Sequence, residues 1–304
     1  MKKVYFLAFA GLFSFFILMG SCNKKVQKDA NQNLISESLD LWSIAANTNN
    51  PIDSVGLIHN LSLDYLSNSS EFPLNDIQSD MRVFTENWGY DSQYMLSKDS
   101  VNNILSEIKT VSENAIDEEN RSSYFSDYVQ TKISGSAAFN SYLSTAFSLI
   151  EINENDISSD SLIGISGVIN EIRNLESEIM LSALEGQEKT ELLATTSILR
   201  YSLAYWMSVA VNPSHPYYYA LTDGSSSEKT SFHNLTSKFW QRVARGLTTV
   251  LADGLGGAIG GVAGAALGTA VGGPAGTVVG MASGIALLGG ISSGAVAANW
   301  PAVN

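Results

Sequence analysis

The sequence predicts a mostly α-helical protein, in which a helical soluble domain is followed by a C-terminal glycine-zipper helical hairpin. Between Leu34 and Val211, apolar residues recur mostly every three or four residues, and no run alternates strictly between apolar and polar residues. The last 51 residues, from Gly254 to Asn304, contain no charged residue and no histidine. In that segment glycine recurs every fourth residue, at Gly256, Gly260, Gly264, Gly268, Gly272, Gly276, Gly280 and Gly284.

Length and charge limit the classes of protein to consider. A chain of 304 residues with 45% apolar content has room for one sizeable domain with a buried core. The formal net charge is −13, and every charged side chain lies before Gly254. Nucleic-acid binding depends on Lys and Arg that neutralise phosphates, so this acidity argues against a nucleic-acid partner. We therefore expect an acidic, solvated body and a neutral tail.

The first 21 residues have the features of a bacterial signal peptide. Lys2 and Lys3 precede an apolar run from Val4 to Leu18, and small residues lead to the single cysteine, Cys22. This pattern resembles the lipobox of bacterial lipoproteins, with Met19 where those proteins usually have leucine. The resemblance implies that Cys22 is acylated and becomes the new N-terminus. An ordinary secretory signal followed by an incidental cysteine is the alternative.

Residues 22–33 are polar and predict a flexible tether, and residues 34–211 predict the helical domain. Asn50, Pro51 and Asp53 suggest a cap and first turn for a helix that ends near Ser67. Further helices are expected at 75–87, 99–115, 120–133, 136–152, 159–184 and 189–211. The last of these is apolar, but Arg200 interrupts it, and the remaining apolar stretch is about half of the roughly 20 residues that a membrane span needs. We expect it to be the central core helix.

A basic amphipathic helix is predicted at residues 231–251, after a loop or linker at 212–230. Lys238, Arg242 and Arg245 recur at spacings of four and three residues, with Trp240 among them. Basic and indole side chains anchor neighbouring spans at membrane interfaces, so these four residues are the predicted membrane-interface group. A soluble helix with a solvated basic face is the alternative.

The tail, residues 252–304, is predicted to fold back at Gly272-Gly273-Pro274, because proline disfavours continuation of a helix. The two halves would be about 28 Å and 33 Å long, close to the hydrocarbon thickness of about 30 Å. Each glycine costs about 1 kcal/mol relative to alanine in a helix, so the arms need close packing partners. Those partners are either a membrane environment or a protein surface that packs on the glycines. A glycine-rich hairpin that is buried in a soluble fold therefore remains an alternative to a hairpin in a membrane.

Glycines outside the four-residue register, including Gly257, Gly261 and Gly289, would form a second small-residue face. We expect one face to close the hairpin and hypothesise that the other meets neighbouring copies in a homo-oligomer. Such tails resemble those of glycine-zipper envelope lipoproteins and, more loosely, glycine-rich segments of pore-forming bacteriocins. Neither resemblance carries a catalytic residue.

No pattern in the sequence predicts catalysis, a metal site or a cofactor. The chain has no HExxH, CxxC or Walker pattern, and no Gly-x-Ser-x-Gly elbow between a strand and a helix. His59 lies near the apolar side of its predicted helix, which favours a hydrogen-bonded core histidine over a ligand or general base. We therefore expect a protein that is not an enzyme.

The combined expectation is a lipid-anchored envelope protein of a diderm bacterium, placed at the outer membrane by its resemblance to lipoproteins. Membrane lipid is the expected partner of the hairpin, and any protein partner is unidentified. Two other functions remain: a membrane-active, bacteriocin-like or pore-forming protein, and an envelope binding module with a soluble fold.

Overall fold

A computed structural model describes residues 43–68, 81, 83–84, 86–87, 95–115, 121–150, 163–184, 186–218, 221 and 232–298. Within the last helix, the side chains of 232–241, 244, 269, 272–279, 282–283, 286 and 293–298 lie outside the description. The described residues are α-helical with connecting turns, and no strand occurs among them. The prediction of an all-α fold is confirmed. All of these residues belong to one compact unit, Asp40–Asn304.

Five amphipathic helices form the outer part of the fold: α3 (Ser54–Ser67), α5 (Lys98–Ala115), α6 (Arg121–Lys132), α7 (Ala137–Ser148) and α8 (Ile163–Leu181). In α6 and α7 the buried residues recur mostly three or four positions apart, as the amphipathic pattern predicts; in α7 they are Phe139, Leu143, Ala146 and Phe147. The Ser136 hydroxyl caps α7 by accepting a hydrogen bond from the Phe139 amide at 3.1 Å. These two helices therefore present an apolar face to the interior, whereas α3 also buries polar residues, among them His59 and Asn60.

The central helix is α9 (Gly186–Val211), and it contacts α3, α7, α8 and the C-terminal helix. It begins at Gly186, whose φ of 52° lies in the left-handed region that glycine adopts readily. From residue 191 to residue 207 every side chain is buried. The prediction that this segment is a core helix is confirmed, and a short 3₁₀ helix, η2 (Pro216–Tyr218), follows it.

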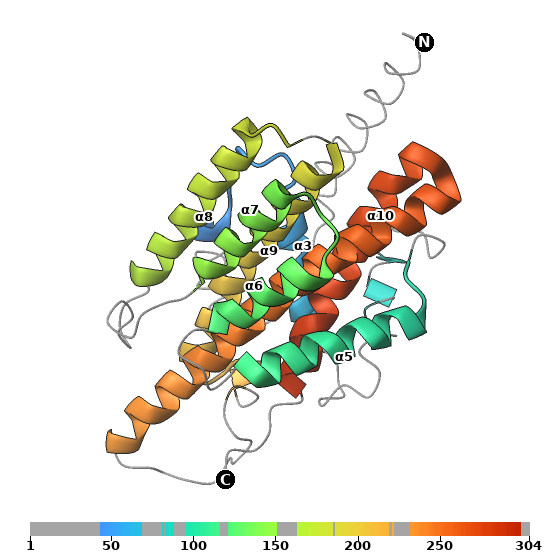
Figure 1. The fold of residues 1–304 in the computed structure, drawn as a ribbon. Coiled ribbons are helices and arrows are strands. Elements are labelled where there is room, and N and C mark those ends of the chain that lie inside the picture. The colour runs from blue at the N-terminus through green and yellow to red at the C-terminus, as the bar shows by residue number, and fades with distance from the viewer. Residues whose placement is uncertain are drawn as a thin grey trace. The chain divides into compact units, whose positions relative to one another are not determined.

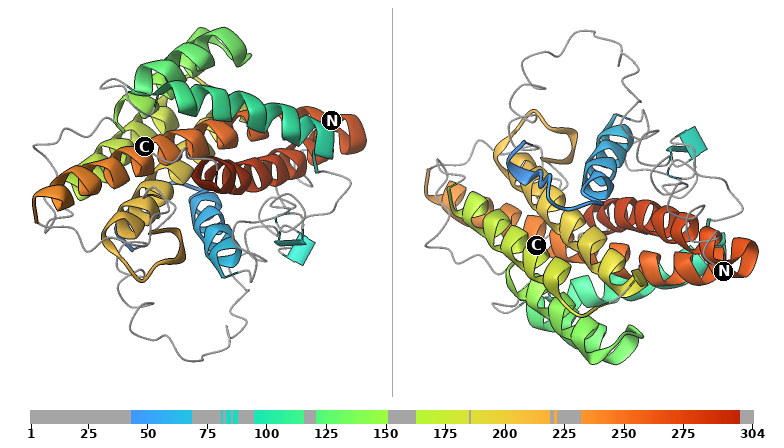
Figure 2. Two further views of the ribbon diagram at one scale, coloured as in Figure 1. Left: turned by 90° about the horizontal axis from the view of Figure 1, so that it is seen from below. Right: turned by 90° about the horizontal axis from the view of Figure 1, so that it is seen from above.

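The C-terminal helix, α10 (Phe232–Ala298), folds back on itself as a hairpin. Figure 1 shows its orange first part turning into a red second part that runs back beside it. In Figure 2 (left), α5 and α3 lie along opposite sides of the two parts, and both helices contact α10. We call residues 254–271 the first arm and residues 275–298 the second arm. The hairpin is thus a central element of the fold.

Three sequence predictions need correction here. The basic helix expected at 231–251 is not separate, because α10 continues through it into the first arm. Backbone around Gly272-Gly273-Pro274 keeps helical geometry, although the chain reverses there. Asn50 is not the cap of α3, which begins at Ser54; residues 48–53 form turns instead. The helix expected at 75–87 falls largely outside the described residues.

Candidate functional site

The two arms of the hairpin meet at glycines. A Cβ atom on Gly260 or Gly264 would overlap the carbonyl oxygen of Gly284 or Gly280, respectively, and the reverse substitutions would cause the same overlap. A Cβ on Gly256 would likewise come within 3.0 Å of the Leu288 carbonyl oxygen. The backbones are therefore close enough that only glycine fits, as in small-residue helix packing. Gly272 and Gly276 lie in the turn region, where only the backbone is described.

The second glycine face is occupied by the same chain. A Cβ on Gly257 would meet the Ile198 side chain of α9, and one on Gly261 would lie 3.3 Å from Cγ of Glu191. On the second arm, Gly289 faces both Ile198 and His59. At these positions the second glycine face therefore packs on α9 and α3 of the same chain, and association with neighbouring copies stays a prediction.

Asp253, the last charged residue of the chain, is fully buried at the base of the first arm. Its Oδ2 accepts hydrogen bonds from Ser202 Oγ at 2.6 Å and from Trp206 Nε1 at 3.1 Å, both on α9. Nε2 of His59, on α3, lies 3.4 Å from the same oxygen. Since His59 also faces Gly289, this cluster joins both arms to α3 and α9. We call these four residues, Asp253, Ser202, Trp206 and His59, the Asp253 anchor.

The anchor does not have the geometry of a nucleophilic triad. In such a triad the histidine lies between the serine and the carboxylate, whereas Ser202 and His59 both contact Asp253. Both side chains are buried, and Nδ1 of His59 lies 3.2 Å from Oδ1 of Asn60, which fits the predicted core histidine. Among the described residues, no three His, Cys, Asp or Glu side chains are grouped to hold a metal ion. The arrangement is suited to fastening helices.

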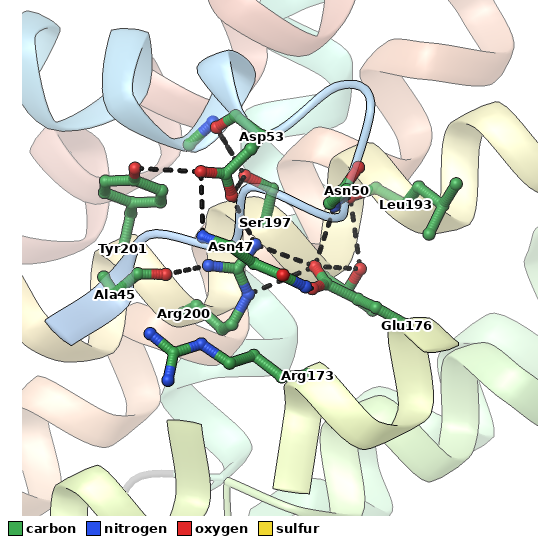
Figure 3. A network of polar contacts seen from close by, with 12 residues as sticks. Ala45, Asn47, Asn50, Asp53, Arg173, Glu176, Leu193, Ser197, Arg200 and Tyr201 are labelled. Atoms are coloured by element: carbon green, nitrogen blue, oxygen red, sulfur yellow. Dashed lines mark hydrogen bonds and ion pairs between the residues drawn. The ribbon is translucent and has the colours of Figure 1, made fainter. Parts of the chain in front are cut away.

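A second polar cluster fastens α9 to α8 and to the turns before α3 (Figure 3). The Arg200 guanidinium, fully buried, donates to Glu176 Oε1 from Nε at 3.1 Å and from Nη2 at 2.9 Å. Its Nη2 also donates to Asp53 Oδ1 at 2.5 Å, and its Nη1 to the Ala45 carbonyl oxygen. Side-chain amides of Asn47 and Asn50 donate to Glu176 at 2.6 and 2.9 Å. We call this group the Arg200 cluster.

The Arg200 cluster leaves few hydrogen-bonding groups of Glu176 or Arg200 unused, which is the condition under which buried charges are tolerated. Sequence reasoning treated Arg200 only as an interruption of an apolar helix, and it did not single out Glu176. Asp53 is 147 residues from Arg200 along the chain, so no local pattern relates them. The only sequence signal was the arginine itself, placed where a core helix had to bury it.

Glu191 is a buried carboxyl on α9 that packs against the first arm near Gly261. Burial raises its pKa from 4.5 to about 7, and a hydrogen bond from Gln187 at 2.6 Å opposes that rise. A raised folded-state pKa means that the stabilising contribution is complete below pH 4.5 and is lost as the pH rises through 7. Ionisation of Glu191 therefore weakens the packing of α9 on the hairpin.

Arg242 and Arg245 were predicted at a membrane interface, but the structure buries both inside the protein. Nε of Arg242 donates to the Ala210 carbonyl oxygen at 2.9 Å, and its guanidinium lies 4.7 Å from the Tyr218 ring centroid. Nη1 of Arg245 donates to the Leu221 carbonyl oxygen at 3.5 Å. The two arginines fasten α10 to the end of α9 and the segment after it, which corrects the prediction for them.

Other predicted site residues lie outside what the structure describes. The side chains of Lys238 and Trp240 belong to the part of α10 described only as backbone, and Cys22 precedes the first described residue. Within the described residues, one helical segment, Arg245–Gly268, is long and apolar enough to cross a membrane. Most of it is buried by the protein, as core helices of soluble proteins also are.

Comparison of the chain with protein-family models, with curated proteins and with solved structures gave no significant match.

Proposed function

We propose that this protein is a lipid-anchored component of a diderm cell envelope, and that it is not an enzyme. In this proposal acylated Cys22 attaches the chain to the outer membrane, and the helical body holds the uncharged hairpin, which associates with membrane lipid. The observation that supports it best is the packing of the hairpin: a segment with no charged residue is covered by α3, α5 and α9 and fastened by the Asp253 anchor.

The packing of α3, α5 and α9 on the uncharged hairpin shields it from water. An uncharged glycine-rich helix would melt alone in water, because glycine is a poor helix former and the segment offers few side chains for solvation. In the folded protein its glycines pack against backbone and side chains instead. A lipid-anchored protein built in this way keeps a membrane-compatible segment soluble beside a membrane.

A membrane-active protein is the second candidate, and the Arg245–Gly268 segment favours it. That segment has the length and composition to cross a bilayer, yet most of it is buried by the rest of the protein. For such a function, α3, α5 and α9 would have to release the hairpin. The two candidates therefore differ in whether the hairpin leaves the body.

Cell fractionation with a Cys22→Ser variant, still exported by its signal, tests the proposal. Wild type is expected to incorporate radiolabelled palmitate and to remain with the outer membrane. The Cys22→Ser protein should lose the label but keep a fraction that resists washing with high salt, because the apolar contact of the hairpin remains. A variant that becomes entirely soluble would contradict membrane association by the hairpin, and an unlabelled wild type would contradict the lipid anchor.

The same purified Cys22→Ser protein separates the two candidates. Release of an entrapped dye from liposomes would support the membrane-active function, and intact liposomes across several lipid compositions would count against it. Deleting the hairpin is a poor control, since α3, α5 and α9 would lose the surface they pack on. Point variants are therefore preferable.

A further inference from the structure

Among the described side chains of the hairpin, the exposed ones lie at the end of the first arm. We call residues 266–271 the apex. Ala266, Ala270 and Val271 are exposed there, with 47% of the Val271 surface accessible, and Leu267 is half-buried, whereas Ala265 just before it packs in the core with Ala194 and Ile198 of α9. Side chains of the first arm before residue 262 are almost all buried. In Figure 1 the apex lies where the orange part of α10 passes into red, at one end of the hairpin.

The chemistry of the apex fits lipid acyl chains. Its exposed side chains are Ala and Val, and no charged residue occurs between Gly254 and the end of the chain. The net charge of −13 is carried entirely by the rest of the protein. An acidic body is repelled by anionic headgroups, whereas the exposed apolar side chains of the uncharged apex are stabilised by leaving water.

A second copy of the chain fits the apex less well. Helix pairing through small residues needs free glycine faces, and the hairpin glycines whose surroundings are described already pack between the arms or against side chains of the body. The proposed lipid anchor also brings a bilayer within reach. About 20 residues separate Cys22 from the first described residue, and such a chain extends up to roughly 70 Å.

We propose that the apex inserts into the hydrocarbon of one leaflet of the membrane that carries the lipid anchor, while the base of the hairpin stays in the body. This inference rests on the proposed function, and it names which part of the hairpin meets lipid. Six helical residues rise about 9 Å, less than half of a hydrocarbon layer of about 30 Å. The Asp253 anchor holds the base below the apex, so the insertion stops within one leaflet.

Site-specific fluorescence on the full mature chain tests the inference. The Cys22→Ser protein contains no cysteine, so Val271→Cys can be labelled with an environment-sensitive nitrobenzoxadiazole dye. The matched control is Leu181→Cys on α8, a side chain that is 89% exposed. The probe is a vesicle of phosphatidylethanolamine and phosphatidylglycerol, prepared with or without trapped iodide and with or without doxyl lipids.

With vesicles, the dye at position 271 should shift to the blue and brighten severalfold, and the dye at position 181 should not change. Doxyl lipids should quench the dye at 271, and iodide on either side of the bilayer should not. Without any dye, Val271→Glu should lower partitioning into vesicles at least tenfold, because a charge in hydrocarbon is unfavourable, while Leu181→Glu leaves it unchanged.

Three results would overturn the inference, and they are distinguishable. If the protein floats with vesicles while the dye at 271 stays in water, another surface makes the contact and only the inference fails. If trapped iodide quenches that dye, the hairpin crosses both leaflets and single-leaflet insertion fails. If the Cys22→Ser protein does not bind vesicles at all, membrane association by the hairpin fails and the inference fails with it.

Discussion

Replacing Gly264 with alanine is expected to destabilise the folded protein by about 2 kcal/mol or more, although alanine is the better helix former. Helix propensity alone would favour alanine by about 1 kcal/mol. The new Cβ, however, would overlap the Gly280 carbonyl oxygen, which is backbone and cannot rotate away. Separating the arms costs overpacking energy, typically 1–3 kcal/mol, and loses the close contacts of the neighbouring glycines.

Urea denaturation of the purified Cys22→Ser protein, followed by circular dichroism, measures this change. Gly167→Ala is the matched control, because nothing lies within 4 Å of a Cβ at that position on α8. We expect the control to gain up to about 1 kcal/mol, so the two glycine-to-alanine changes should have opposite signs. Stabilisation by both would mean that the arms do not meet at Gly264.

Replacing Arg200 with methionine is expected to reduce the free energy of unfolding by about 3–5 kcal/mol. Methionine fills similar volume, but it leaves the fully buried Glu176 carboxylate without its cation. Asp53 loses the same partner. Because a domain of this size is stable by only about 5–15 kcal/mol, the variant should be close to the limit of folding.

The control for Arg200→Met removes the cation of an ion pair that is exposed rather than buried. Lys109 lies 3.6 Å from Glu113 on the surface of α5, with 42% of its side chain accessible. Lys109→Met should change the free energy of unfolding by less than about 0.5 kcal/mol, because exposed ion pairs contribute little. Equal effects at the two positions would show that the Arg200 cluster is not buried as described. Partial recovery by adding Glu176→Gln to Arg200→Met would locate the cost in the unpaired carboxylate.

Most helix positions could be predicted from the local spacing of apolar residues in the sequence. The helix predicted at 99–115 is observed as Lys98–Ala115, and that predicted at 120–133 as Arg121–Lys132, since amphipathic spacing is a local property of the chain. The reversal near Gly272 also followed from sequence, through its glycines and proline. The burial of α9 followed from its composition, once Arg200 had ruled out a long apolar span.

The position of the hairpin inside the helical body could not be predicted from the sequence. Its glycine spacing shows that something packs closely on the arms, but hydrocarbon, another copy and this chain's own helices meet that requirement equally. The partners that decide the matter, such as His59 with Asp253 and Glu191 beside Gly261, are far apart in sequence. Arg242 and Arg245 misled for a related reason: basic and aromatic residues just before an uncharged tail are typical of a membrane interface, whereas these two side chains donate to the carbonyl oxygens of Ala210 and Leu221.

Disulfide trapping between α9 and the first arm tests most directly whether the hairpin lies inside the helical body. In the purified Cys22→Ser protein, Glu191→Cys and Gly261→Cys form the reporting pair, because a Cβ at 261 would lie 3.3 Å from Cγ of Glu191, near the position a sulfur would take. Gly167→Cys with Gly261→Cys is the control pair. Mild oxidation should cross-link the first pair quantitatively and the control pair hardly at all; a first pair that stays reduced would contradict a hairpin packed on α9.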